Sequence, residues 1–297
     1  MKKKKVKRLR FCGINPPRFD RSQIKIWVYL LPIAVLMAVP IIFNVSTALK
    51  PLDELFLYPP TLFPHKPTLG NFTQLFRFSD ENSVPFSRYM FNSLLSSGIV
   101  VVASIIFSLM AGYVLSKKEF AGRQLLSTIN TIALMFAPAA VTIPRFFVIK
   151  YLGLIDNFGA HIWPALAMPV GLFLVKQFID QLPDALFDAA KVDGANDYFI
   201  VSRIVAPMVV PALVTVAILA FQSSWNATVA SASYINNETL KTLPSYMSSI
   251  TDTTSGKTVA GMGASAAANL IVFLPNLLLF IILQSRVMNT MAHSGIK

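Results

Sequence analysis

Six apolar runs, separated by polar segments, dominate the pattern of this chain. They occupy residues 26–49, 91–115, 125–143, 159–175, 207–222 and 264–284. A hydrocarbon layer is about 30 Å thick, so an α-helix of roughly 20 apolar residues is enough to cross it. Pro138 and Pro144 are expected to bend or end the third run, and Pro275 to break the sixth. The pattern predicts an all-α membrane protein with six transmembrane helices.

One stretch interrupts this pattern, because it is highly charged although apolar runs flank it on both sides. Its eight charged side chains are Lys176, Asp180, Asp184, Asp188, Lys191, Asp193, Asp197 and Arg203. Each charge at the bilayer centre costs about 2.5–3.5 kcal/mol, so this stretch is expected outside the membrane. A small-residue-rich loop on one face of a membrane protein suits contact with a partner protein. The alternative is an amphipathic loop that rests on lipid headgroups.

The middle of this stretch, residues 182–206, predicts two short helices joined by a turn. Pro183 suits the first turn of a helix, where a backbone N–H is not needed. Asp193-Gly194 signals a turn, and Asp193 is expected to cap the second helix. Gly194 and Ala195 would let another protein approach the backbone closely.

Composition favours a membrane protein over a soluble enzyme. Hydrophobic residues make up 54% of the chain and charged residues only 13%, compared with roughly 25% charged residues in soluble domains. The single cysteine, Cys12, excludes an internal disulfide, and the three histidines lack metal-ligand spacing. The sequence has no G-x-x-x-x-G-K-[ST] phosphate loop. We therefore expect a chain that is not an enzyme and that binds no metal or cofactor itself.

The net charge of +12 is concentrated near the N-terminus. Residues 1–25 carry ten of the 26 lysines and arginines, which predicts a basic tail beside anionic lipid. A nucleic-acid-binding arm is disfavoured because few aromatic residues lie among the basic ones. A signal peptide is disfavoured because the following apolar run is too long. We expect contact with membrane lipid and not with nucleic acid.

The distribution of positive charge also orients the spans. With the N-terminus inside, residues 1–25, 116–124, 176–206 and 285–297 face the cytoplasm and hold 18 of the 26 lysines and arginines. Cytoplasmic segments carry such an excess, so both termini and the charged loop are expected there. The resulting organisation has four parts. They are a basic cytoplasmic tail (1–25), a first span with an external loop (26–90), a five-helix core (91–284) and a cytoplasmic C-terminal tail (285–297).

The charged loop carries a recognisable motif. Residues 188–190 read Asp-Ala-Ala, and residues 193–195 read Asp-Gly-Ala after two intervening positions. Two prolines four residues apart, Pro207 and Pro211, follow them. With this spacing, residues 182–211 resemble the EAA loop, Glu-Ala-Ala-x-x-Asp-Gly-Ala, of permease subunits of binding-protein-dependent (type I) ABC importers.

This resemblance implies the type I permease fold, with six spans and a cytoplasmic coupling helix. It implies a second, different permease subunit, two copies of an ABC ATPase that bind ATP and Mg, and an extracytoplasmic sugar-binding protein. The residues that would contact the ATPase are Asp188, Ala189, Ala190, Asp193, Gly194 and Ala195. The loop departs from the family pattern at Asp188, where Glu is usual. The expected mid-loop aromatic residue is displaced, with Tyr198 and Phe199 the nearest candidates.

Further stretches resemble the carbohydrate branch of this family, and especially subunits like the second maltose permease. They are Trp225-Asn226, Thr242-Leu243-Pro244 and the tail at residues 294–297. The resemblance implies import of a sugar, with an oligosaccharide favoured by the long external segments, across the inner (cytoplasmic) membrane of a bacterium. Candidate residues of the substrate pathway are Asn92, Asn130, Gln222, Trp225 and Asn276. The polar ones would equally serve to join helices, and Trp225 would equally serve as an interfacial anchor.

Three other classes of membrane protein are consistent with parts of the pattern. A permease of the same superfamily could carry an amino acid, a peptide or an inorganic anion, although the Trp-Asn pair and the tail argue against it. A secondary transporter predicts an inverted internal repeat, and none is detectable. A lipid-modifying enzyme or a membrane scaffold would need ionisable residues clustered at one membrane depth, and spans two to six show no such cluster.

Overall fold

The computed structural model describes residues 24–59, 61–81, 84–136, 140–252 and 259–294, and every regular element among them is helical. Four segments are long and apolar enough to cross a membrane: Ile26–Leu49, Phe86–Lys117, Phe158–Asp180 and Gly261–Gln284. A fifth results if Asp197–Met208 and Val210–Trp225, which meet at an angle of 85°, count as one span. The described chain is therefore an all-helical membrane protein with four or five candidate spans.

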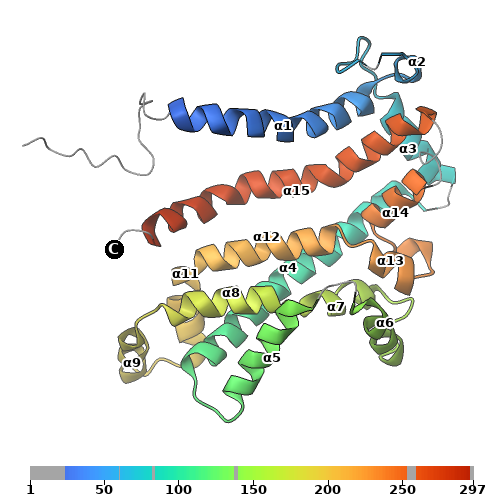
Figure 1. Cartoon of the computed structure of the whole chain (residues 1–297). Coiled ribbons are helices and arrows are strands. Elements are labelled where there is room, and N and C mark those ends of the chain that lie inside the picture. The colour runs from blue at the N-terminus through green and yellow to red at the C-terminus, as the bar shows by residue number, and fades with distance from the viewer. Residues whose placement is uncertain (1–23, 60, 82–83, 137–139, 253–258, 295–297) are drawn as a thin grey trace, which may run out of the picture.

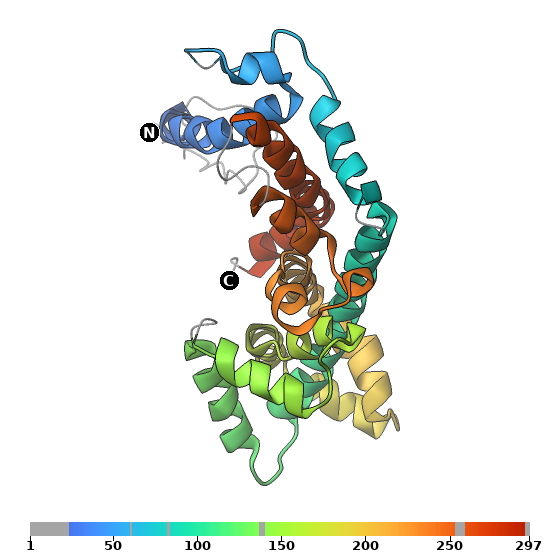
Figure 2. The same ribbon diagram turned by 90° about the vertical axis from the view of Figure 1, so that its right-hand side faces the viewer.

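The long helices lie side by side in a row. In order across Figure 1, they are α1 (Ile24–Leu49), α15 (Val259–Ser294), α12 (Val210–Trp225), α8 (Pro169–Asp180) and α5 (Arg123–Met135), with α4 (Phe86–Lys117) crossing α12 and α8. Figure 2 shows α1 and α5 at opposite ends of this row. The two ends of the helices differ. The short helix α9 (Asp184–Val192) lies at one end of the long helices, which we call the α9 end. Several short helices cover the opposite end.

The centre of the fold is a close contact of α4 with α8 and α12. Every fourth residue along one face of α4 is buried and small or β-branched: Ser96, Val100, Ser104, Ser108 and Gly112. A Cβ atom on Gly171 of α8 would lie 2.8 Å from Ser108 Oγ, and one on Gly112 would lie 3.1 Å from Val175 Cγ1. Small residues at such positions allow membrane helices to approach closely. The glycines thus fix the spacing between α4 and α8.

The third apolar run does not form one continuous helix, and the first helix ends earlier than the prolines of the run predicted. Helix α5 ends at Met135, and α6 (Thr142–Tyr151) begins with Pro144 in its first turn, where proline is tolerated. Pro144 therefore helps to start a new helix and does not end the previous one, while Pro138 lies outside the described residues. With 13 residues, α5 rises only about 20 Å. Helix α5 begins at the α9 end, whereas α6 lies at the opposite end (Figure 1). The chain therefore passes from one end of the long helices to the other between the start of α5 and α6.

The fourth and sixth runs respond differently to their prolines. The fourth is divided into η2 (Phe158–His161), α7 (Trp163–Leu166) and α8, with prolines in the first turns of α7 and α8. The sixth stays helical through Pro275, contrary to the expected break, and α15 continues to Ser294. Residues 285–294, expected as part of a tail, are thus helical. Most of the basic N-terminal tail, residues 1–23, and residues 295–297 lie outside the described residues.

The opposite end is built from α2 (Leu52–Leu55), α3 (Gly70–Glu81), α13 (Val229–Tyr234), η4 (Glu238–Leu240) and α14 (Leu243–Ile250). Asn71 of α3 ties this end to α1, since its Nδ2 donates to the carbonyl oxygens of Ala48 at 2.8 Å and Lys50 at 2.9 Å. A Cβ on Gly263 of α15 would lie 2.5 Å from Asn71 Oδ1, so α15 packs directly against the Asn71 side chain.

A buried carboxylate organises the loop that follows α2. Glu54 is only 8% exposed and accepts hydrogen bonds from the backbone N–H groups of His65, at 2.9 Å, and Lys66, at 2.7 Å. Burial alone would raise the pKa of Glu54, but the two backbone donors and the charges of His65 and Lys50 lower this pKa below its ordinary value of 4.5. The ionised carboxylate therefore fixes the loop backbone at His65 and Lys66 to α2.

Candidate functional site

The charged loop forms two short helical segments joined by a turn, as expected. Helix α9 begins after Pro183, carries Asp184 in its first turn and Lys191 in its last, and ends at Val192. Acidic and basic side chains at these respective ends complement the helix dipole. The second segment consists of α10 (Asp197–Phe199), a π-helical stretch (Ile200–Val205) and α11 (Ala206–Met208).

The turn after α9 is a Schellman motif. Gly194 has φ +81°, and its N–H donates to the carbonyl oxygen of Lys191 at 3.0 Å. The N–H of Ala195 donates to the carbonyl oxygen of Ala190 at 2.9 Å. These two bonds and the left-handed glycine define the motif, in which glycine avoids the strain that other residues meet. The Asp-Gly-Ala sequence therefore encodes the end of α9.

The cap of the second segment is a correction to the sequence prediction. Asp193 is the C-cap residue of α9, so it does not cap α10. Asn196 takes this role, since its Oδ1 accepts a hydrogen bond from the backbone N–H of Phe199 at 2.8 Å. Asn is among the residues preferred at this position, which is the signal that the prediction missed.

The six motif residues divide into an outer and an inner set. Asp188, Ala189, Asp193 and Gly194 are exposed, whereas Ala190 is 8% exposed and Ala195 is half-buried. The two inner alanines belong to an apolar cluster that includes Phe187 of α9 and Tyr113 of α4. The outer set is therefore free to meet another molecule, and the inner set seats α9 on the helix row.

The exposed face of α9 also carries apolar side chains that were not predicted as part of the site. Leu186 is 39% exposed and Val192 is 87% exposed. Together with Ala189 they recur every three residues, which places them along one side of a helix. We call Leu186, Ala189 and Val192 the apolar stripe of α9. Their spacing in the sequence would have identified them.

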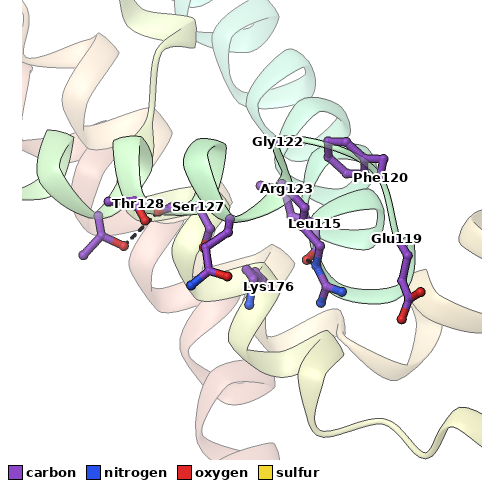
Figure 3. Close-up of a pocket in the computed structure, with 10 residues that line it drawn as sticks. Leu115, Glu119, Phe120, Gly122, Arg123, Ser127, Thr128 and Lys176 are labelled. Carbon is purple, nitrogen blue, oxygen red and sulfur yellow. Dashed lines mark hydrogen bonds between the residues drawn. The ribbon is translucent and has the colours of Figure 1, made fainter.

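A polar pocket of about 700 Å³ lies beside the loop at the α9 end (Figure 3). Figure 3 shows Ser127 and Thr128 of α5 and Lys176 of α8 along this pocket. Arg123, also in its wall, donates through Nε and Nη2 to the carbonyl oxygens of Leu115, at 2.9 Å, and Ser116, at 2.8 Å. These bonds fix the start of α5 to the end of α4. Among the described residues, no group of three His, Cys, Asp or Glu could hold a metal ion.

The predicted pathway residues do not form one site. Asn92 is 2% exposed, and its Nδ2 donates to the carbonyl oxygens of Thr239 at 2.8 Å and Lys241 at 2.9 Å. Its polar hydrogens are thus used within the chain. Asn130 lies apart from the others, in an apolar groove of about 480 Å³, and donates to the carbonyl oxygen of Pro169 at 3.2 Å.

The other three pathway candidates meet where α12 ends beside α15. Trp225 is 1% exposed, and its indole N–H donates to the carbonyl oxygen of Val272 at 2.9 Å. Gln222 is exposed, and Asn276 Nδ2 donates to Asn226 Oδ1 at 3.0 Å. Asn276 Oδ1 is buried and has no hydrogen-bond partner among the described residues. Asn226 and Asn276 thus join the end of α12 to α15, and Gln222 lies one turn before Asn226; we call these three residues the amide cluster.

The chain is similar to known components of transport systems. Residues 104–287 match the family model described as "Binding-protein-dependent transport system inner membrane component". The sulfoquinovosyl glycerol transport system permease protein SmoH of Agrobacterium fabrum is 29% identical over 87% of this chain and 88% of its own length. The arabinooligosaccharides transport system permease protein AraQ of Bacillus subtilis is 28% identical over 95% of this chain and 99% of its own.

The fold has a counterpart among solved structures. One chain of a bacterial ABC transporter involved in the import of the acidic polysaccharide alginate superposes with a TM-score of 0.72. The match covers 91% of this chain and 99% of that one, at 23% sequence identity. The helical arrangement is thus one that an importer subunit adopts.

Proposed function

Since the chain belongs to the family of inner membrane components of binding-protein-dependent transport systems, we propose how it works as the permease of an ABC importer for sugars. It is a multi-pass transport subunit without a catalytic role of its own. The exposed motif residues of the loop between α8 and α12 carry the proposal, because their spacing and their outward position suit a docking partner. That partner is an ABC ATPase, present in two copies, which binds ATP and Mg.

The proposed topology has six crossings with both termini in the cytoplasm. The crossings are α1, α4, the chain from α5 to α6, the chain from η2 to α8, α12 and α15. Helix α5 supports the third crossing because it starts at the α9 end while α6 lies at the opposite end. The excess of lysine and arginine in residues 1–25, 116–124, 176–206 and 285–297 supports a cytoplasmic position for the α9 end. The short helices at the opposite end then face the extracytoplasmic binding protein.

Coupling follows from this placement. The ATPase pair closes on ATP, pushes α9 through the outer motif residues and the apolar stripe, and tilts the spans that α9 contacts. A rigid-body movement of this kind alternates access between two sides of a membrane. A second permease subunit of different sequence completes the pathway. The EAA motif and the exposure of its outer residues support this mechanism.

The transported solute is proposed to be an oligosaccharide. Two relatives are named for glycosylated or oligosaccharide substrates, and the amide cluster offers hydrogen-bonding groups that suit sugar hydroxyls. We assign Gln222, Asn226 and Asn276 to the substrate pathway, because Gln222 and Asn226 are exposed and Asn276 bonds to Asn226. Asn92 and Trp225, with their polar hydrogens used inside the chain, hold helices together.

Reconstitution tests the proposal. The chain is placed in liposomes with its companion permease, ATPase and binding protein, and uptake of arabino-oligosaccharides, trehalose, an amino acid mixture and a dipeptide is measured. We expect uptake of a sugar only when ATP is present on the cytoplasmic side. Uptake of the amino acid or peptide would support a non-sugar permease. Uptake driven by an ion gradient without the ATPase would identify a secondary transporter.

A further inference from the structure

The C-terminal end of α4 contacts both flanks of α9 through consecutive lysines. Lys117 is the last residue of α4, and its Nζ lies 2.7 Å from Asp184 Oδ1 and donates to the carbonyl oxygen of Leu182 at 2.8 Å. Its side chain is only 10% exposed, although that of Asp184 is 80% exposed. This lysine therefore reaches inward to hold the start of α9.

The next residue holds the other flank. Lys118 Nζ lies 2.7 Å from Asp197 Oδ1, at the first residue of α10. The same carboxylate oxygen accepts a hydrogen bond from the hydroxyl of Tyr113, one turn earlier in α4, at 3.1 Å. The last residue of α4 and the residue that follows it thus bind the segments before and after the Schellman turn.

Aromatic packing fills the space between these two ion pairs. Phe187, on the inner side of α9, is 3% exposed, and Lys117 Nζ lies 5.0 Å from the centre of its ring. The Tyr113 and Phe187 rings are 6.1 Å apart. A cation near a desolvated aromatic face is attracted to it. The contact of α9 with α4 is therefore apolar in the middle and ionic at both edges.

The same end of α4 is joined to α8. Ser116 Oγ donates to Asp180 Oδ1 at 2.6 Å, and Gly112 packs against Val175. A displacement of α9 therefore bears on α4 directly and on α8 through α4. Lysines at a cytoplasmic helix end often serve only to bind lipid headgroups. Here both Nζ atoms have protein partners at hydrogen-bond distance, which indicates a different use.

We propose that Lys117 and Lys118 form a two-point clamp that transmits the movement of α9 into α4, and so acts as a positioning device for coupling. The inference rests on the proposed function, since it requires that α9 receives its movement from an ATPase. In the reverse direction, the same clamp passes the arrival of the loaded binding protein to the ATPase, because coupling between two sites is reciprocal. Without the clamp, α9 still docks but moves separately from α4.

The experiment uses the complete importer in liposomes and measures MgATP hydrolysis with and without binding protein that has been incubated with arabino-oligosaccharides. Asp197→Asn removes the charge with little change of shape, and Lys118→Met keeps the length of the side chain. We expect each to lower the stimulation by binding protein about tenfold. Co-purification of the ATPase and unstimulated hydrolysis should stay within about twofold of wild type. Lys118→Asp combined with Asp197→Lys should restore the stimulation, which would identify the ion pair as the cause of the loss.

Lys176→Met is the matched control, because Lys176 pairs with Asp180 at 2.7 Å within α8 and its side chain is 21% exposed, so this pair bridges neither flank of α9. It should leave the stimulation unchanged. Full stimulation of hydrolysis in Asp197→Asn and Lys118→Met would refute the proposed clamp. A charge-swap variant that assembles with the ATPase but does not regain the stimulation would also refute it. If the wild-type importer neither retains the ATPase nor responds to its binding protein, the proposed function itself has failed.

Discussion

Gly194 offers a sharp test of the coupling surface, because its substitution separates backbone strain from obstruction of a partner. The residue has φ +81°, and a Cβ atom built on it would meet nothing within 4 Å. A residue other than glycine in this conformation costs about 1–2 kcal/mol, compared with roughly 5–15 kcal/mol for the stability of a typical domain. Gly194→Trp should therefore still insert and fold.

The effect on a docked partner should be larger. An indole placed on the outer set of motif residues must be accommodated within a packed interface, where overpacking costs about 1–3 kcal/mol. Since 1.4 kcal/mol is a factor of ten, we expect ATPase affinity to fall by roughly ten- to a hundredfold and uptake to be lost. Gly194→Asn should cost little in either respect, because Asn tolerates the left-handed conformation.

Gly153 provides the matched control. It has φ +68°, and a Cβ atom there also meets nothing within 4 Å, but it lies after α6 at the opposite end. Gly153→Trp carries the same strain and the same added bulk away from the ATPase. The assay compares membrane quantity, ATPase retention and uptake for the three variants. Normal uptake by Gly194→Trp at wild-type expression, or an equal loss of ATPase retention in both Trp variants, would refute the reasoning.

Three further predictions concern stability. Gly263→Ala should destabilise the protein by about 1–3 kcal/mol, because the added Cβ would displace Asn71. The thermal midpoint in detergent should fall accordingly, and an unchanged midpoint would contradict this contact. Trp225→Phe removes the indole donor to the carbonyl oxygen of Val272, which also accepts from Asn276 Nδ2, so stability should fall by about 0.5–1.5 kcal/mol. The substrate concentration for half-maximal uptake should be unchanged, and a shift in it would indicate direct contact with substrate. The lowered pKa of Glu54 means that its contribution to stability is fully present above the ordinary pKa of 4.5 and is lost as the pH falls through the lowered value. The thermal midpoints of wild type and Glu54→Gln should therefore differ at neutral pH and converge in acid, and a constant difference would exclude the carboxylate as the cause.

The positions of most helices could be predicted from the sequence, because long apolar runs and charge distribution are local properties. The first, second and sixth runs each lie within a long helix, and the charged loop has its two helical segments. The third run was less predictable, because whether Pro144 ends one helix or starts the next depends on the turn in which it falls. Pro275 stays inside α15, although it removes the N–H that would donate to the carbonyl of Ile271, as membrane helices tolerate.

The sequence predicts where the charged loop lies, but not which of its residues are buried. The motif located the loop, but burial separates Ala190 from its neighbour Ala189, and this depends on how α9 packs on Tyr113. Likewise, Asn92 and Gln222 are similar as polar residues in the sequence. Only the fold shows that one is enclosed by backbone carbonyls and the other is exposed. Contacts between distant segments decide these cases.

The central claim is that the exposed face of α9 docks on a nucleotide-driven partner. It is tested most directly by placing a photo-activated cross-linking residue at Ala189 in the assembled importer. Leu69, which is 65% exposed at the opposite end, serves as the control position. The account predicts that position 189 cross-links to the ATPase and position 69 does not. Cross-linking of position 189 to lipid alone, or to the external binding protein, would contradict it.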